Sequence, residues 1–277
     1  MSGKFSVRKY LRDVPLPFCP GCGSLTIMNE FLRAIYEQGN EDLSKFVFCS
    51  GIGCSAWIPS PYFIADSVHT LHGRSIPVAT GIKLLRPDLN VVVFGGNGDI
   101  VGIGLSHFIH AARRNLDILA IMVNNMVYGM TGGQVAPTTP FKLKTTTTPY
   151  GSFEYPLDAA KLAVTAGAVY VARWTTANPK ELKESIKKAL KTQGFRFVEA
   201  VSQCPTAFGR RVGFRNAGEM LKWFKETAVP LERAEKMSED DLADKIVVGE
   251  FIRKQRPTLI ETLHKTIEEA QEKHDED

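Results

Sequence analysis

Long apolar runs are missing from this sequence of 277 residues. No stretch approaches the roughly 18 uninterrupted apolar residues that mark a membrane-spanning helix. The first segment, MSGKFSVRKYLRDVPLPF (residues 1–18), also lacks the apolar core of a secretory signal peptide. We therefore expect a protein that works in the cytoplasm without contacting a membrane.

A strong charge of one sign is also missing. The chain has 34 Lys and Arg against 30 Asp and Glu, a formal net charge of only +4. The two arginine pairs, Arg113–Arg114 and Arg210–Arg211, are too short to mark a basic groove, so we expect no nucleic-acid partner. Apolar residues make up 44% of the chain, which is enough for the core of one large α/β domain or two small ones.

Cysteine is scarce, and a second Cys-x-x-Cys pair is absent. The chain has five cysteines, and the cytoplasm disfavours disulfides, which leaves metal binding, redox chemistry or burial. A zinc site would need a second close pair beside Cys19 and Cys22. A redox dithiol would normally follow a strand, whereas this pair lies on an irregular arm. An iron–sulfur cluster needs four thiolates, which can be far apart in sequence.

The remaining cysteines are of two kinds. Cys54 in GIGCS and Cys204 in CPT each follow an expected strand. Cys49 ends an apolar strand and is predicted to be a core thiol. Both Cys19 and Cys204 precede proline, as one ligand does in bacterial ferredoxin motifs. The sequence therefore allows one [4Fe–4S] cluster with the ligands Cys19, Cys22, Cys54 and Cys204.

Apolar periodicity predicts strands that alternate with helices. The expected strands are 45–50, 90–96, 116–125, 169–174 and 195–201, and the expected helices are 24–37, 75–85, 99–114, 157–168 and 180–191. This alternation predicts an α/β fold with a doubly wound, mostly parallel sheet. We expect one domain over residues 1–218, the arm 1–18 included, and a helical C-terminal extension over residues 219–277.

The segment 126–152 is polar, with Gly, Thr and Pro throughout. It is too long for an ordinary connection, which indicates a functional loop. Ligands of doubly wound sheets bind beyond the carboxyl ends of the strands. We therefore expect this loop, the glycine-rich turn at 95–99 and Cys204 to lie at one functional edge of the sheet.

The glycine-rich turn FGGNGDI (94–100) joins an expected strand to an expected helix. It is neither the dinucleotide fingerprint G-x-G-x-x-G nor a P-loop. Its glycines permit either a tight turn or a close approach of backbone N–H groups to an anion. Asn125 follows Asn97 by 28 residues, which is one strand–helix–strand unit, so both should reach the same sheet edge. Oxygen ligands from two neighbouring strand ends suit Mg²⁺ bound to phosphate.

This spacing resembles the thiamine-diphosphate-binding motif. The resemblance implies that Asn97, Asn125 and the backbone carbonyl of Val127 hold Mg²⁺ under the diphosphate of the cofactor. The family normally has aspartate where this chain has Asn97. Because an amide brings no charge, either Mg²⁺ binds more weakly, or Asp99 supplies a negative charge close to the ligands without binding the metal itself. On charge alone, Asn97→Asp should tighten Mg²⁺ binding.

Several motifs together carry a wider resemblance. CPGCG, GIGCS, HTLHGRSIPVATGIKL, GNGD, HFIHAARRN, NNMVYGMTGGQVAPTTP and CPT occur in this order between Cys19 and Arg215. They resemble the β subunit of a 2-oxoacid:ferredoxin oxidoreductase, in particular the 2-oxoglutarate branch of that family.

The resemblance implies a reaction, cofactors and partners. The reaction is the oxidative decarboxylation of a 2-oxoacid with coenzyme A, giving succinyl-coenzyme A and CO₂ when the 2-oxoacid is 2-oxoglutarate. The β subunit would bind thiamine diphosphate, Mg²⁺ and one [4Fe–4S] cluster that passes electrons to ferredoxin. A separate α subunit would supply the other half of the thiamine site, so the chain would be active only with that partner.

The resemblance also implies roles for individual residues. His72 and Arg74 of HGR are the expected catalytic residues, close to the cofactor and the substrate. Met130 is expected to support the bent conformation of the cofactor. The expected cofactor-binding residues are Gly53, Ser55, His72, Gly73, Gly96, Gly98, Asp99, Asn125, Gly129, Met130 and Thr131.

Two alternatives stay open from the sequence. Within the same enzyme class, the substrate can be pyruvate or a branched-chain 2-oxoacid. From another class, the chain can be an iron–sulfur electron carrier with no chemistry of its own. The spacing of Asn97 and Asn125 argues against a carrier, which has no need to hold Mg²⁺ and a diphosphate.

Overall fold

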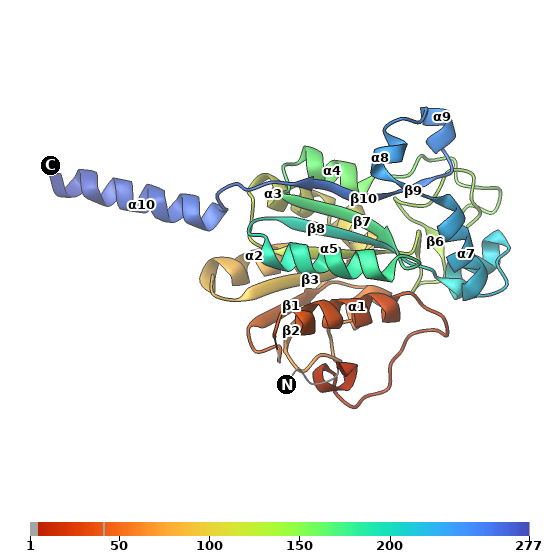
Figure 1. The fold of residues 1–277 in the computed structure, drawn as a ribbon, viewed down its shortest axis with the longest axis horizontal. Helices are drawn as coiled ribbons and strands as arrows, with labels where there is room; N and C mark the ends of the chain where they lie inside the picture. Colours follow the sequence, from red (N-terminus) through yellow and green to blue (C-terminus); the bar gives the residue numbers. More distant parts are fainter. Residues whose placement is uncertain (1–4, 41, 277) are drawn as a thin grey trace.

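The computed structural model describes residues 5–40 and 42–276. Residues 1–4 of the predicted arm and residue 277 of the predicted extension lie outside this part, as does residue 41. Eight strands form the main sheet in the order β2-β1-β3-β4-β8-β7-β10-β9 (Figure 1). Their bounds are β1 Phe46–Ser50, β2 Asp66–His69, β3 Asn90–Gly96, β4 Leu119–Asn124, β7 Tyr170–Thr175, β8 Arg196–Val201, β9 Ala228–Pro230 and β10 Ile246–Arg253.

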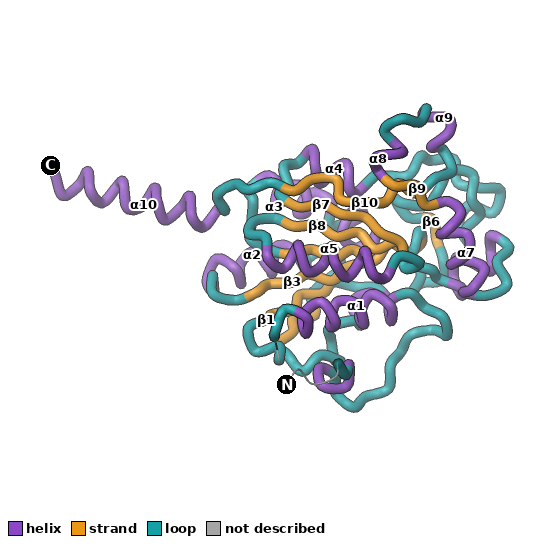
Figure 2. The backbone as a smooth tube through the Cα atoms, in the orientation of Figure 1, coloured by secondary structure: helices purple, strands orange, loops and turns teal. Residues whose placement is uncertain are grey.

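Helices cover both faces of this sheet, as Figure 2 shows. One face packs against α1 (Ser24–Glu37) and α5 (Pro179–Lys191), and the other against α2 (Ser75–Leu85), α3 (Leu105–Arg113) and α4 (Ala159–Thr165). Strands that are covered on both faces need continuous apolar sequence, which explains runs such as 90–96 and 119–124. The predicted doubly wound α/β fold is confirmed.

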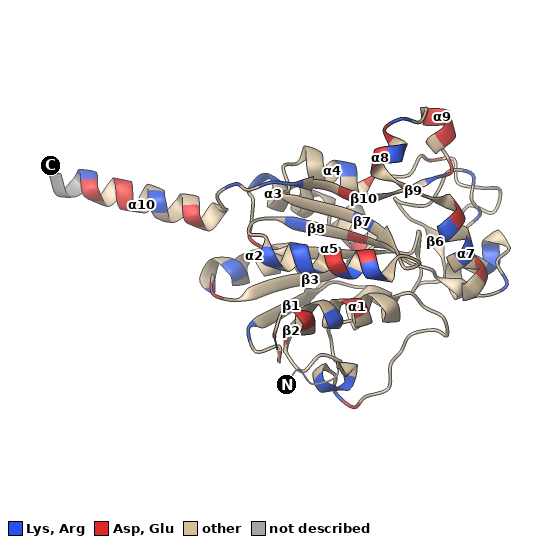
Figure 3. Cartoon of the chain, viewed as in Figure 1, with Lys and Arg blue, Asp and Glu red and all other residues tan. Residues whose placement is uncertain are grey.

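Amphipathic spacing explains why the covering helices form where they do. In α1, Ile27, Phe31 and Ile35 are buried against the sheet. In α5, Leu182 and Ile186 are buried, while its lysines and glutamates face outward. Figure 3 shows that basic and acidic residues alternate along α5 and α10 (Leu259–Glu276).

The C-terminal region differs from its prediction. After residue 218 the chain contains helices, but it also contains β9 and β10, and β10 pairs antiparallel with β7. The β-branched residues of Ile246–Val248 favour this strand, although charged neighbours on both sides suggested a helix. The helices of this region are α7 Ala217–Thr227, α8 Leu231–Ala234, α9 Glu239–Leu242 and α10, which extends away from the body (Figure 1). The boundary at residue 218 stays a proposal about domain organisation.

Two further elements were not predicted in this form. The edge strand β2 is exposed along its whole length and lacks an apolar pattern. The helix predicted over 99–114 is divided into η3, a π-helical segment (Gly98–Ile103), and α3. Gly102 and Gly104 weaken regular helix at this point, and π-helical turns often lie at functional sites.

Short elements complete the chain. They are η1 Val7–Tyr10, η2 Cys54–Trp57, η4 Pro205–Gly209, α6 Arg210–Val212 and the two-stranded sheet of β5 Val127–Tyr128 and β6 Gln134–Val135. Within the described residues, every helix is too short or too polar to cross a bilayer.

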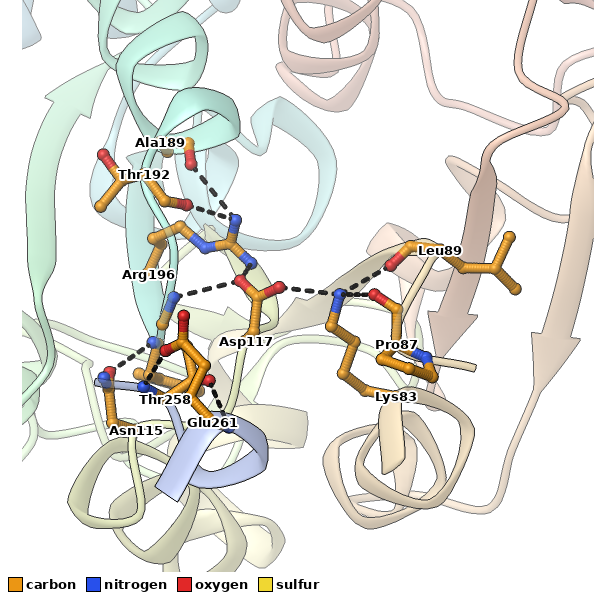
Figure 4. Close-up of polar contacts among 12 residues, drawn as sticks. Lys83, Pro87, Leu89, Asn115, Asp117, Ala189, Thr192, Arg196, Thr258 and Glu261 are labelled. Carbon is orange, nitrogen blue, oxygen red and sulfur yellow. Dashed lines mark hydrogen bonds and ion pairs between the residues drawn. The ribbon is translucent and has the colours of Figure 1, made fainter. Parts of the chain in front are cut away.

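A buried ion cluster lies at the amino-terminal ends of the central strands (Figure 4). Asp117, which precedes β4, pairs with Lys83 of α2 at 2.7 Å and with Arg196 of β8 at 2.9 Å. Asp117 also accepts a hydrogen bond from the backbone of Gly194 at 3.1 Å. Burial raises the pKa of Asp117, but Arg196 and Lys83 outweigh it, so the pKa lies below its usual value. The cluster fastens α2 to the sheet at the edge opposite the functional one.

Candidate functional site

A cavity of about 130 Å³ lies at the carboxyl ends of β1, β3 and β4. This is the edge at which doubly wound sheets bind ligands. The cavity is lined by Ile52, Gly53, Cys54, Ser55, His72, Gly96, Asn97, Gly98, Asp99, Val123, Asn125, Val127, Tyr128, Gly129, Met130 and Thr131. All the expected cofactor-binding residues therefore line it except Gly73, and all three expected Mg²⁺ ligands line it too.

The glycine-rich turn is shaped by close neighbours. A methyl group at Gly98 would lie 2.0 Å from the ring of Tyr128, so only glycine fits beneath that ring. A methyl group at Gly96 would lie 3.2 Å from the Ser55 hydroxyl. That hydroxyl is buried and has no hydrogen-bond partner among the described residues. A buried polar group without a partner costs free energy, so Ser55 is suited to a polar ligand in the cavity.

The two expected amide ligands lie on the cavity wall. The Asn97 side-chain nitrogen donates to the Thr138 hydroxyl at 2.7 Å. The Asn97 oxygen is thus the end of the amide that remains for a cation. Asn125 Oδ1 accepts a hydrogen bond from the backbone of Val127 at 3.3 Å, which closes the turn after β4. Oxygen donors of this type suit Mg²⁺.

Asp99 is buried and holds three segments together. Its Oδ1 accepts hydrogen bonds from the backbone of Gly73 at 2.7 Å and of Ile52 at 3.1 Å, and it lies 2.7 Å from His72 Nδ1. Its Oδ2 is buried without a partner among the described residues. The carboxylate therefore ties the loops after β1 and β2 to the glycine-rich turn. Compensation for Asn97 by Asp99 stays a proposal.

The two expected catalytic residues are placed differently. The His72 ring lines the cavity, bonded to Asp99 and 6.4 Å from the ring of Tyr128. Arg74 is exposed, donates to the Gly73 carbonyl at 3.1 Å and does not line the cavity. Arg74 is therefore next to the cavity-lining His72 in sequence, but its side chain is exposed and lies outside the cavity lining.

The four candidate ligand cysteines come from three distant segments that meet at one place. The backbone of Gly23 donates to the Gln203 carbonyl at 3.1 Å, which fastens the arm beside Cys204. Burial, together with the nearby thiols of Cys204, Cys22 and Cys19, raises the pKa of Cys54 to about 11. The arm and the two strand ends therefore bring these sulfurs within electrostatic reach of one another.

Cys204 and Cys49 differ in their surroundings. Burial raises the pKa of Cys204, but backbone N–H groups of Ala207 and Phe208 donate to its sulfur and oppose the rise. Cys49 lies fully in the core, where burial alone raises its pKa to about 12. Its predicted role as a core thiol is therefore confirmed.

In the described part of the chain, no three or more His, Cys, Asp or Glu side chains are close enough to hold a single metal ion. The [4Fe–4S] cluster at the four cysteines stays a prediction.

Gly129 lies next to both the amide region and the cysteine region. A methyl group at this residue would lie 2.9 Å from Asn125 Nδ2, 3.7 Å from Cys204 Sγ and 3.8 Å from Cys54 Sγ. The space left by the missing side chain thus borders the expected Mg²⁺ ligand and two expected cluster ligands.

Comparison with known proteins identifies the family. Residues 51–200 match the family model described as thiamine pyrophosphate enzyme, C-terminal TPP binding domain. The 2-oxoglutarate synthase subunit KorB of Methanocaldococcus jannaschii is 53% identical over 262 residues, which are 94% of this chain and 96% of that protein.

The chain belongs to the KorB family. The KorB subunit of Methanothermobacter marburgensis is 49% identical over 96% of this chain and 94% of that protein. A solved structure of 2-oxoglutarate:ferredoxin oxidoreductase from Magnetococcus marinus, with 2-oxoglutarate, coenzyme A and succinyl-CoA bound, has a TM-score of 0.84. It is 36% identical and covers 96% of this chain and 91% of that chain. The expected family and the expected class of oxidoreductase subunit are confirmed.

Sequence reasoning missed the residues that support the expected ligands. Thr138 lies in the polar loop and was not singled out, although it anchors Asn97. Tyr128 covers Gly98, and nothing in its sequence position indicates this contact. Glu199 and Arg173 are charged residues inside otherwise apolar strands, and that irregularity is the signal that could have found them.

Proposed function

We propose that the chain is the β subunit of a 2-oxoglutarate:ferredoxin oxidoreductase. With an α subunit it converts 2-oxoglutarate and coenzyme A to succinyl-coenzyme A and CO₂ and passes the electrons to ferredoxin. The observation that carries the proposal is that one cavity is lined by the glycine-rich turn with Asn97, by Asn125 after β4 and by Cys54. Such a cavity joins a diphosphate site to a cluster ligand.

The residues of the cavity fit thiamine diphosphate and Mg²⁺. Asn97, Asn125 and the Val127 carbonyl would hold Mg²⁺, and the Ser55 hydroxyl would donate to a phosphate oxygen. When bound, the thiazolium ring of the cofactor serves as the electron sink for decarboxylation. His72, fixed by Asp99, would bind polar groups of the substrate or cofactor at the cavity wall.

The cysteines Cys19, Cys22, Cys54 and Cys204 would hold the [4Fe–4S] cluster. Cys54 belongs to the cavity wall and Cys19 is exposed, so the set spans the distance from the cavity to the surface. This arrangement suits a cluster that takes electrons at the cofactor and delivers them to a carrier protein. Five free cysteines also suit the reducing cytoplasm in which we place the protein.

The cavity is incomplete without a partner. Its volume of about 130 Å³ is below the roughly 300–1,000 Å³ of sites that enclose drug-sized ligands. Ile52 and Met130, which line the cavity, are exposed apolar side chains. Leu71, which precedes His72, and Ile103, which lies beside Gly73, are exposed as well. Exposed apolar groups of this kind mark protein interfaces. An α subunit that covers them would enclose the second half of the cofactor.

The preference for 2-oxoglutarate rests on the relatives, which are 2-oxoglutarate synthase subunits. A dicarboxylate needs a cation for its distal carboxylate, and Arg74, exposed and two residues after the cavity-lining His72, is the candidate from this chain. Pyruvate and branched-chain 2-oxoacids remain the competing substrates.

The test is co-purification of the chain with its native α partner, followed by a panel of 2-oxoacids with a viologen acceptor. We expect the highest kcat/KM with 2-oxoglutarate. Arg74→Met should lower it roughly ten- to a hundredfold for 2-oxoglutarate, since charge-assisted hydrogen bonds contribute about 1.5–3 kcal/mol, and should spare pyruvate. Arg114→Met, at the opposite end of the sheet, is the control. A strong preference for pyruvate by the unmutated complex would exclude the proposed substrate.

A further inference from the structure

We propose that a buried hydrogen-bond chain from Glu199 through Asn124 and Thr138 positions the Asn97 amide, so that its oxygen and not its nitrogen faces the Mg²⁺–diphosphate site. The inference rests on the proposed function, because the cation it concerns is the one that would be held under the diphosphate. It assigns positioning roles to three residues outside the expected ligand set.

The hydrogen-bond chain begins at an ion pair inside the sheet. Glu199 of β8 accepts from Arg173 Nε at 2.7 Å, and Arg173 also pairs with Asp158. The other oxygen of Glu199 accepts from Asn124 Nδ2 at 2.8 Å. In its ion pair with Arg173, the Glu199 carboxylate accepts hydrogen bonds and has none to donate. Asn124 must therefore direct its nitrogen toward Glu199.

In the next two hydrogen bonds of this chain, the donor and the acceptor cannot exchange roles. Asn124 Oδ1 accepts from the Thr138 hydroxyl at 2.8 Å and from the backbone of Met126 at 3.1 Å. The single hydroxyl proton of Thr138 is thereby used, so the group at residue 97 must donate to Thr138. Asn97 does so through Nδ2 at 2.7 Å. Its oxygen is left for the cavity.

Burial makes each link costly to break. Arg173, Glu199, Asn124, Thr138 and Asn97 are between 2% and 8% exposed. Water cannot easily replace a missing partner at such positions, so the direction of donation is enforced along the whole chain.

This arrangement reverses the expectation from charge alone. An aspartate at residue 97 has no N–H group for Thr138, and turning the Thr138 proton toward it would take that proton from Asn124. Two acceptor oxygens would then face each other in a buried site. We therefore expect Asn97→Asp to weaken Mg²⁺ binding while the chain is intact.

The first test changes Thr138. Thr138→Val removes the hydroxyl and keeps the shape, so the Asn97 amide loses its anchor. We expect the Kd for Mg²⁺, titrated by calorimetry into the αβ complex with thiamine diphosphate, to rise about tenfold, the equivalent of one hydrogen bond. Thr138→Ser should bind as the unmutated complex does. Thr148→Val is the matched control, because Thr148 is buried in the same loop but bonds to Thr145.

The second test couples the two positions. Asn97→Asp should weaken Mg²⁺ binding when Thr138 is present and tighten it in the Thr138→Val background, where no acceptor faces the new carboxylate. Tightening in both backgrounds, or unchanged binding in Thr138→Val, would overturn the inference. An unmutated complex that binds no thiamine diphosphate would refute the proposed function instead. In that case the hydrogen-bond chain is still tested by the Tm of the αβ complex without cofactor. Asn97→Asp should lower this Tm only when Thr138 is present.

Discussion

Ser55 shows how a single atom can indicate a ligand. Its hydroxyl is buried at the cavity wall without a hydrogen-bond partner among the described residues. Burying such a group without a partner costs its desolvation free energy. A hydrogen bond to a phosphate oxygen in the cavity would offset that cost. The neighbouring Gly96 leaves the space that this contact needs.

Ser55→Ala should therefore weaken thiamine diphosphate binding without harming the fold. A hydrogen bond to a charged group contributes about 1.5–3 kcal/mol, so we expect a roughly ten- to a hundredfold higher Kd in a titration of the αβ complex. Ser185→Ala, which removes a buried hydroxyl that accepts from Trp174, should leave the Kd unchanged. Equal binding by the Ser55 variant would exclude the hydroxyl from the cofactor site.

The iron content of cysteine variants distinguishes the expected cluster ligands from the core thiol. Cys204→Ala should reduce the iron and the acid-labile sulfide of the purified complex to near background, because a [4Fe–4S] cluster needs all four thiolates. Cys49→Ala should retain both, since Cys49 is a fully buried core thiol outside the expected set. Iron loss in the Cys49 variant with retention in the Cys204 variant would reverse the assignment.

At the scale of elements, periodicity predicted most of the sheet and its covering helices. The bounds of α1 and α2 agree with the predictions. In α1 the buried apolar residues follow a helical spacing, and α2 ends just before Arg86–Pro87, where proline cannot continue a helix. The predictions failed where tertiary contacts override local pattern. β10 pairs with β7 despite charged flanks, and the π-helical η3 forms where Gly102 and Gly104 interrupt the predicted helix.

The ion cluster that fastens α2 to the sheet predicts a pH dependence. The pKa of Asp117 is lowered in the folded protein, so its stabilisation is fully present above its ordinary value of 3.8 and is lost as the pH falls through the folded value. Asp117→Asn leaves Lys83 and Arg196 buried without an anionic partner and should cost about 3–5 kcal/mol at neutral pH.

Urea unfolding of the purified chain from pH 7 to pH 3 measures this effect. The difference in free energy of unfolding between the unmutated chain and Asp117→Asn should stay constant near neutral pH and shrink below about pH 4. Asp88→Asn, at an exposed ion pair with Arg86, should leave stability unchanged. A difference that does not depend on pH would mean that the carboxylate charge plays no part.

For the whole molecule, the sequence predicted which residues meet but not how they are oriented. Strand order alone brings Asn97 and Asn125 to one edge, and the structure places both on the cavity. The support from Thr138, Asn124 and Glu199 could not be predicted, because it depends on side-chain directions across three elements. Sequence spacing carries no such information.

The exposed apolar side chains in and beside the cavity predict assembly. Leu71 is 78% exposed beside His72, so Leu71→Glu should prevent the chain from co-purifying with its α subunit and abolish decarboxylation. Leu85→Glu is the matched control, because Leu85 is 82% exposed at the far end of α2. Size-exclusion chromatography with light scattering reports the result. A complex that forms equally well with the Leu71 variant would exclude this surface from the interface.

The missing side chain at Gly129 bears on how the proposed enzyme evolved. A methyl group there would lie 2.9 Å from Asn125 Nδ2, closer than a real side chain allows, and in ordinary contact with the sulfurs of Cys54 and Cys204. Drift at this position would therefore disturb the expected Mg²⁺ ligand first, and a larger side chain would also press on the expected cluster ligands. Selection should hold the residue to glycine for both reasons.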